Sequence, residues 1–326
     1  MSILARPVVA SFVAKAMQRA VMAAQRGNGR GSKASSLDRF PEYPRNAREL
    51  TIPTSAGPAR AIVYMPATDG APAPVHVNFH GGGYVMPLTD MEDPLCRYLA
   101  AEAGAIVINV DYVLAPQHPF PGPPHQAFEV VRWIASHGAE QGWDGSRLSV
   151  GGQSAGGALA AAVARQSLEQ GGPAIALQVL HYPPLDLATS AKDKRAAIAK
   201  PVLRPWMAEV FDTAYVPDPP ERLNRLVSPG NPADTADLGG MAPALVITAE
   251  FDLLKAEGAY YAERLRQAGA LVEYYDVPGA DHGYDGKDDE KARQVYELVA
   301  RHLKEATNPK ATSPKATEPT EPRITE

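Results

Sequence analysis

Short apolar runs alternate with longer stretches of helical periodicity through the centre of the chain. Apolar runs bounded by turn residues are typical of buried strands, and apolar residues that recur every three or four positions are typical of helices. The alternation predicts βαβ units, and therefore a mainly parallel sheet with helices on both faces. The predicted strands are residues 75–79, 105–113, 148–151, 176–181 and 245–249, with others near Ile62 and Leu271, and the predicted helices are residues 123–137, 155–170, 256–268 and 287–305.

Two regions depart from this alternation, and we expect them to form a helical cap over the sheet. Apolar side chains recur at helical spacing in residues 3–22, with basic residues elsewhere around the wheel, which predicts an amphipathic helix. Residues 183–241 are punctuated by prolines and only partly helical, so they predict an insertion. The side chains expected to roof an apolar pocket are Phe12, Met17, Trp206, Met207 and Phe211.

The remaining segments complete the expected domain organisation. Residues 27–36 are rich in Gly and Ser, which is typical of a flexible connection. The end of the chain consists of Thr, Pro, Lys and Glu with almost nothing to bury, so we expect it to be disordered. The segments are residues 1–45 (cap helix and linker), 46–182 (first part of the core), 183–241 (cap insertion), 242–306 (second part of the core) and 307–326 (disordered tail).

Composition and charge exclude several classes of protein. The 326 residues are enough for one large core with an appendage, and a net charge of -5 provides no basic surface for a nucleic-acid partner. The single cysteine, Cys96, excludes an internal disulfide or a multi-cysteine metal site, and we expect it to be a small buried side chain. No apolar stretch approaches the roughly 18 residues that a bilayer span needs, so no stable membrane insertion is expected. Lys15 and Arg19 interrupt the apolar run at residues 7–14, which favours a cytoplasmic location over a secretory signal.

A Gly-x-Ser-x-Gly pattern follows the predicted strand 148–151 and opens the predicted helix 155–170. The pattern is Gly152-Gln153-Ser154-Ala155-Gly156. In a nucleophile elbow the serine occupies a strained turn between a strand and a helix, and the glycines leave room for the segments that cross beside it. Ser154 is therefore the candidate nucleophile, at a helix start whose free N–H groups favour a developing anion.

Two further strand ends carry groups that such a serine needs. The run His80-Gly81-Gly82-Gly83 follows strand 75–79, and consecutive glycines let backbone N–H groups face a reacting oxygen, which predicts an oxyanion hole. Asp252 follows strand 245–249, and His282 follows a strand that begins near Leu271. Because catalytic groups of open α/β sheets gather at the carboxyl ends of strands, we expect His282 to be the base and Asp252 to orient it. The order Ser, Asp, His is the one expected for an α/β-hydrolase.

These motifs resemble those of the hormone-sensitive lipase-like esterases, bacterial esterase family IV, over about residues 75–303. The resemblance implies an α/β-hydrolase fold and a cap made of the first helix and the 183–241 insertion. It also implies that the backbone N–H groups of Gly82, Gly83 and Ala155 form the oxyanion hole. The stretch at residues 111–116 is similar to another motif of the family.

The sequence departs from the family pattern at four positions. Gln153 precedes the serine where an acid is common, and Val113 and Gln117 stand where Arg and Glu are usual. Ala256 occupies the place of a second acid after Asp252. None of these positions supplies the nucleophile, the base or an oxyanion donor. We therefore expect an active enzyme with altered specificity or stability. A structural ion pair of the family should be missing.

The function indicated is a serine carboxylic-ester hydrolase that acts on short- to medium-chain acyl esters through a covalent acyl-enzyme. The alternatives are an acyltransferase or amidase with the same triad, and a non-catalytic small-molecule receptor on the same fold. The expected partner is a small-molecule ester, and no cofactor or metal is expected, since His118 and His125 lack a recognisable third ligand. The sequence leaves open a homodimer and a first helix that docks on lipid.

Overall fold

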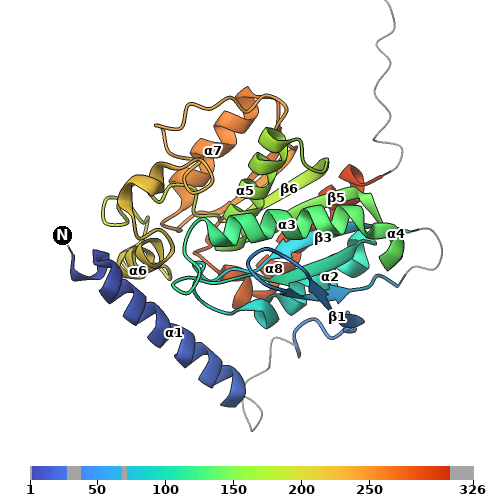
Figure 1. Cartoon of the computed structure of the whole chain (residues 1–326), viewed down its shortest axis with the longest axis horizontal. Coiled ribbons are helices and arrows are strands. Elements are labelled where there is room, and N and C mark those ends of the chain that lie inside the picture. The colour runs from blue at the N-terminus through green and yellow to red at the C-terminus, as the bar shows by residue number, and fades with distance from the viewer. Residues whose placement is uncertain (1, 28–37, 68–71, 309–326) are drawn as a thin grey trace, which may run out of the picture.

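An eight-stranded sheet runs through the centre of the protein (Figure 1). The computed structural model describes residues 2–27, 38–67 and 72–308. The strand order is β1-β2-β4-β3-β5-β6-β7-β8, with β2 antiparallel to both its neighbours and parallel pairing from β4 to β8. The strands are β1 (Ala47–Ile52), β2 (Ala59–Tyr64), β3 (Ala73–Phe79), β4 (Ile106–Asp111), β5 (Trp143–Gln153), β6 (Ile175–His181), β7 (Ala244–Ala249) and β8 (Leu271–Val277). The predicted mainly parallel sheet is confirmed.

Helices cover both faces of the sheet (Figure 1). One face carries α3 (Gly122–Ser136), α5 (Ala155–Gln170) and α7 (Lys255–Gln267), and the other carries α2 (Asp93–Ala103) and α8 (Asp289–Ala306). Two clusters of buried apolar side chains, one on each side of the sheet, form the core. The short elements are α4 (Gly138–Gln141) and the 3-10 helices η1 (Ile3–Ala5), η3 (Thr89–Glu92), η4 (Pro219–Leu223) and η5 (Tyr284–Gly286).

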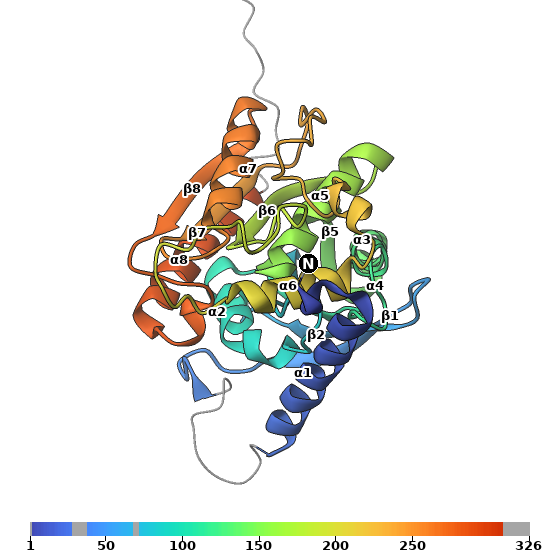
Figure 2. The same ribbon diagram turned by 90° about the vertical axis from the view of Figure 1, so that its left-hand side faces the viewer.

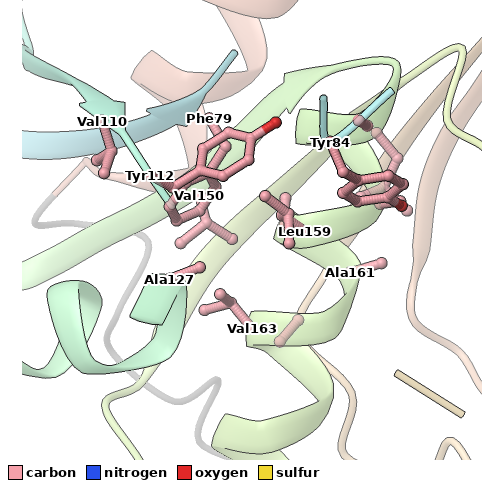
Figure 3. Close-up of a cluster of buried hydrophobic side chains, with 14 of the residues drawn as sticks. Phe79, Tyr84, Val110, Tyr112, Ala127, Val150, Leu159, Ala161 and Val163 are labelled. Carbon is pink, nitrogen blue, oxygen red and sulfur yellow. The ribbon is translucent and has the colours of Figure 1, made fainter. Parts of the chain in front are cut away.

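The larger cluster fixes the central helix α5 against the sheet. Figure 3 shows Phe79 and Val150 of the sheet close to Leu159 and Val163 of α5, with Ala127 of α3 beside them. All five side chains are buried. Because α5 starts immediately after β5, this packing fixes the position of the turn between them.

The predicted strands and helices are all present, and α5 spans the predicted residues 155–170. Apart from the short elements, two were not predicted. Strand β1 lies at the edge of the sheet with mostly exposed or half-buried side chains, so its apolar pattern is weak. Helix α2 buries nine of its eleven residues, Cys96 and the charged Asp93 and Arg97 among them, so its charged side chains do not mark a solvent-facing side.

The two predicted cap segments meet beside the sheet. Helix α1 (Pro7–Gly27) packs against α6 (Pro205–Tyr215), which lies between β6 and β7, and Figures 1 and 2 show α1 starting beside α6 and running away from it. The fully buried apolar side chains of α1 are Ala10 and Ala14. Gln18 continues this buried stripe, and its amide donates to the carbonyl oxygens of Val85 and Ala115, both at 2.9 Å.

The ends of the expected segments fall partly outside the described residues. This is so for most of the predicted flexible connection at 27–36 and for residues 309–326 of the predicted tail. Thr307 ends α8, where its hydroxyl donates to the carbonyl oxygen of Leu303 at 2.7 Å. In the part of the chain that the structure describes, no helix has both the length and the apolar character needed to cross a membrane.

Candidate active site

Ser154 lies at a sharp turn between β5 and α5. Its backbone has φ 52° and ψ -122°, a conformation that L-residues rarely adopt, and its N–H donates to the carbonyl oxygen of His181 at 2.8 Å. A Cβ on Gly152 would lie 2.2 Å from the carbonyl oxygen of Phe79, and one on Gly156 would lie 1.7 Å from it. Both positions therefore require glycine, because the backbone at the end of β3 lies directly against the turn.

His282 lies between Ser154 and Asp252. Its Nε2 is 3.0 Å from Ser154 Oγ, and its Nδ1 is 2.7 Å from Asp252 Oδ2. The carboxylate is 3% exposed, and its other oxygen accepts the backbone N–H of Leu254 at 3.0 Å. With the Nδ1 proton donated to Asp252, Nε2 is left as the acceptor of the serine hydroxyl proton. The structure thus brings together the three side chains that the sequence indicated from three separate strand ends.

The charge around His282 favours its protonated form. Burial lowers the pKa of the imidazole, but the negative charge and hydrogen bond of Asp252 outweigh burial, and the charges of Asp281 and Asp285 add to them. The net result is a pKa above the ordinary value of 6.5. This environment stabilises the imidazolium that forms when a proton is transferred to His282.

The glycine run after β3 faces the same space as Ser154. Gly82 and Gly83 have φ of 115° and 61°, which favour glycine, and both line the cavity beside the serine. No acceptor among the described residues takes the backbone N–H of Gly82, Gly83 or Ala155. Because Ala155 is the first residue of α5, its N–H also lies at the positive end of the helix dipole.

A buried acid supports the glycine run from behind. The backbone N–H of Gly81 donates to Glu92 Oε1 at 2.6 Å, and the amide of Asn78 donates to Glu92 Oε2 at 2.6 Å. Burial raises the pKa of Glu92 to about 8, although both hydrogen bonds oppose the shift. His80 also acts on this loop: it is buried, its Nδ1 lies 2.7 Å from the carbonyl oxygen of Gly81, and its ring stacks on Tyr112.

A second buried carboxylate, Asp285, lines the cavity. It accepts hydrogen bonds from the hydroxyls of Tyr182 at 2.6 Å and Tyr296 at 2.9 Å, and from the amide of Gln153. The neutral Gln153, where the family commonly has an acid, is therefore a hydrogen-bond donor to Asp285. This contact links the residue before the serine to the loop that carries His282.

The cavity beside Ser154 has a volume of about 250 Å³. The glycine run, His282 and Asp285 form part of its wall, and α6 contributes Met207 and Phe211. The ring of Phe211 would lie 2.5 Å from a Cβ on Gly83, so α6 rests directly on the glycine run. The ring of Tyr215 stacks on Tyr84 at 3.8 Å, which holds α6 in place.

The predicted roof is correct for Met207 and Phe211 and wrong for the other three side chains. Phe12 is 73% exposed and Trp206 is 49% exposed, and neither they nor Met17 line the cavity. The reason is that α1 buries its stripe of small side chains, including Ala10 and Ala14, which turns Phe12 towards solvent. Helix α1 therefore packs against α6 without reaching the cavity.

The other departures from the family pattern have neutral replacements. Gln117 exchanges amide hydrogen bonds with Gln18 of α1, at 2.8 and 3.2 Å. The backbone N–H of Val113 donates to the side chain of Gln126 at 2.7 Å. Within residues 2–27, 38–67 and 72–308, no three His, Cys, Asp or Glu side chains come together as a metal-ligand set.

Sequence reasoning missed several polar residues of the cavity. Glu92 and Asp285 support the glycine run and the histidine loop, and Lys194 and Asp212 line the cavity from the insertion. Asp285 follows His282 by three positions on the same loop, and this proximity was the one available signal. Lys194 lies in a polar stretch whose sequence is typical of a solvent-exposed loop.

Comparisons with known proteins agree with this geometry. Residues 76–285 match a family described as alpha/beta hydrolase fold. Esterase LipI of Mycobacterium tuberculosis is 38% identical over 261 residues, which cover 77% of this chain and 78% of the relative. Ethyl acetate hydrolase of Pseudomonas putida is 36% identical over 233 residues, covering 69% and 72%. The solved structure of a hyperthermophilic esterase from Pyrobaculum calidifontis matches with a TM-score of 0.79 at 32% identity, covering 89% of this chain and 90% of that one.

Proposed function

Because the chain belongs to the α/β-hydrolase fold family, among the hormone-sensitive lipase-like esterases, it is a carboxylic-ester hydrolase, and we propose that Ser154, His282 and Asp252 are its catalytic residues. The observation that carries the proposal is the continuous chain of contacts from Asp252 through His282 to Ser154. This chain ends in a cavity whose wall contains free backbone N–H donors. Such an arrangement is what acyl transfer from an ester requires.

In the first half of the proposed reaction, Ser154 Oγ attacks the ester carbonyl carbon while its proton passes to His282 Nε2. The carbonyl oxygen becomes an oxyanion that accepts hydrogen bonds from the N–H groups of Gly82, Gly83 and Ala155. The carbon–oxygen bond to the alcohol then breaks, and His282 gives its proton to the departing alcohol. Ser154 is left acylated.

In the second half, water attacks the acyl-enzyme and gives its proton to His282. The second oxyanion collapses, the carboxylic acid is released, and the proton returns to Ser154. The negative charge of Asp252 stabilises the imidazolium in both halves. Apart from the ester and the attacking water, these steps use only groups of this chain.

We propose short- to medium-chain acyl esters as substrates. The cavity volume of about 250 Å³ is slightly below the usual range for small-molecule sites, and Met207 and Phe211 limit its length. Each buried methylene contributes about 0.8 kcal/mol until the space is full. The relative from Pseudomonas putida, an ethyl acetate hydrolase, supports the same size range.

We also propose that α1 and residues 183–241 act together as the cap. Support comes from the packing of α1 on α6 and from the contact of α6 with the glycine run. This packing makes α1 part of the folded enzyme, which supports the expectation of a cytoplasmic location.

The test is a series of aryl esters of graded acyl length, with wild type and Ser154→Ala. Loss of a triad nucleophile can cost on the order of a million-fold in turnover, so the variant should be inactive with an unchanged melting temperature. A fluorophosphonate should label Ser154 and nothing else. Labelling of another residue, or an Ala variant that keeps most of its activity, would refute the assignment.

Asp252 has a matched control on the same loop. Asp252→Asn should lower kcat by about 10⁴, because the amide stabilises the wrong tautomer of His282. Glu250 instead accepts the backbone N–H of Gly279 at 2.7 Å, so Glu250→Gln should stay within a few-fold of wild type. The opposite pattern would give the orienting role to Glu250.

A further inference from the structure

One part of the cavity wall beside Ser154 is polar, and the proposed ester hydrolysis gives it no role. It consists of Tyr84, Lys194 and Asp212, which we call the polar pole. All three are buried: Tyr84 is 3% and Asp212 8% exposed, and the Lys194 side chain is 7% exposed. Lys194 and Asp212 belong to the 183–241 insertion, whereas Tyr84 directly follows the glycine run.

The hydrogen bonds of the polar pole are incomplete. Among the described residues, none donates to the carboxylate of Asp212, and none bonds to the hydroxyl of Tyr84. Lys194 has three donor hydrogens, and the structure gives it one partner, Glu257 Oε2 at 2.6 Å. Buried polar groups in native proteins are normally paired, so three incompletely paired groups on one cavity wall require an explanation.

Neighbouring acids outside the cavity wall show the usual pattern. Asp186 accepts the backbone N–H of Thr189 at 3.0 Å and the amide of Asn231 at 2.8 Å. Glu257 accepts the backbone N–H of Leu185 at 2.7 Å in addition to the Lys194 contact. Of these two acids and Asp212, only Asp212, which faces the cavity, lacks a donor among the described residues.

The three groups also interact electrostatically. Burial raises the pKa of Asp212 to about 6, while the positive charges of Lys194 and Arg222 lower it and the negative charges of Asp186 and Glu209 raise it. Asp212 is thus mostly ionised at neutral pH, as an acceptor beside a cationic donor. Burial raises the pKa of Tyr84 well above its ordinary value, with contributions from Asp212 and Glu257, so its hydroxyl keeps its proton.

We propose that the polar pole recognises a hydroxyl group carried by the ester substrate, an inference that rests on the proposed ester hydrolysis. A hydroxyl donates one hydrogen bond and accepts others, so it can bond to Asp212 and to Lys194 or Tyr84 at the same time. A carboxylate would face Asp212 and Glu257, and an ammonium group would face Lys194. A plain alkyl chain would leave all three groups of the pole unpaired.

A site built to bond a substrate hydroxyl discriminates strongly against the analogue that lacks it, because its own buried groups are then left without partners. The cavity also has apolar walls that accept simple esters. We therefore expect kcat/KM for a hydroxylated ester to exceed that for the alkyl ester of equal length by at least tenfold.

The experiment compares matched pairs on each side of the ester bond. One series carries the hydroxyl in the acyl chain, as ω-hydroxyacyl and alkanoyl aryl esters of equal length. The other carries it in the alcohol, as diol monobutyrates and alkyl butyrates of equal length. Amino and carboxy analogues of the same lengths complete both series. The expected result is a hydroxyl preference of at least tenfold in at least one series.

The variants test whether Asp212 is responsible. Asp212→Leu should abolish the hydroxyl preference while hydrolysis of the alkyl esters continues, and Asp212→Asn, which keeps an acceptor oxygen, should retain part of it. Glu209→Gln on the same helix is the control and should keep the full preference. If the Leu variant does not fold, as judged from thermal unfolding, a reduced preference in the folded Asn variant is the required result.

The outcomes separate this inference from the proposed function. Absence of Ser154-dependent hydrolysis of every ester would refute the function itself. Hydrolysis with no hydroxyl preference in either series, or a preference that survives in the folded Asp212 variants, would overturn the role of the pole. A stronger preference for the amino or carboxy analogues would overturn the hydroxyl assignment.

Discussion

At the scale of single residues, the proposed role of His282 as the base predicts how activity depends on pH. The imidazole must be neutral to accept the serine proton, so activity appears as the pH rises through its pKa. Burial lowers this pKa, but Asp252, Asp281 and Asp285 together raise it above 6.5. The midpoint of kcat/KM against pH should therefore lie above 6.5, measured on a short-chain aryl ester. A midpoint below 6.5, or a flat profile in folded enzyme, would contradict His282 as the base.

Gln153 should not tolerate the acid that its family position commonly holds. Its amide donates to the buried carboxylate of Asp285, so Gln153→Glu would place two carboxylates in contact and force one of them to bind a proton. We expect a loss on the order of 1–3 kcal/mol in the free energy of unfolding at pH 8, and a smaller loss at pH 5. Thermal unfolding at both pH values measures it.

Gln117 provides the matched control for that substitution. It is exposed, and its side-chain oxygen already accepts the amide of Gln18, a bond that a carboxylate keeps. The bond lost is the one that the Gln117 amide donates to Gln18, at a position open to solvent. Gln117→Glu should leave the melting temperature nearly unchanged. Equal losses at the two positions would show that the contact with Asp285 is not what matters.

At the scale of elements, α6 connects the insertion to the glycine run. Phe211 lines the cavity and packs directly on Gly83. Phe211→Ala should lower kcat/KM for butyryl esters about tenfold and move the best acyl length upward, because the enlarged space takes added methylenes at about 0.8 kcal/mol each. Steady-state kinetics across the aryl ester series is the measurement.

The same helix offers a control in Trp206. This side chain is about half exposed and lies outside the cavity wall, so Trp206→Ala should leave the acyl-length profile within twofold of wild type. If both variants change the profile equally, the effect comes from a general loosening of α6.

At the scale of the whole molecule, buried titratable groups predict how stability varies with pH. Burial lowers the pKa of His76 to about 3 and of His181 to about 4, so below pH 6.5 these two groups bind more protons in the unfolded chain and, by themselves, make stability rise with pH. Burial raises the pKa of Glu92 to about 8 and of Glu257 to about 7, so the folded chain holds protons that the unfolded chain has lost. Between pH 6.5 and 8 only this second effect remains, and stability should fall.

The melting temperature should therefore decline between pH 6.5 and pH 8. Glu92→Gln removes the acid with the highest of these pKa values, so the melting temperature of the variant should decline less between pH 6.5 and pH 8. A variant with the same decline as wild type would exclude Glu92 as its source.

Site residues that directly follow a strand can be predicted from the sequence. Site residues that depend on contacts between distant segments cannot. Ser154, Asp252 and His282 each follow a recognisable strand, and the ends of parallel strands meet at one edge of the sheet. The support of Gly81 by Glu92 depends on the fold of an intervening loop. The predicted orientation of α1 is wrong because the helix buries its small side chains, Ala10 and Ala14, and leaves the larger Phe12 exposed. No pattern in the sequence indicates that Lys194 and Asp212 lie close to each other in the cavity wall.

The place of His282 after β8, the last strand among the described residues and an edge of the sheet, has a consequence in time. A ribosome makes the serine turn and the glycine run before it makes β8. Until β8 has been made, the growing polypeptide therefore carries the proposed nucleophile without its proposed base. Hydrolysis by these residues requires β8 to be paired with β7, both in a newly made chain and after refolding from denaturant.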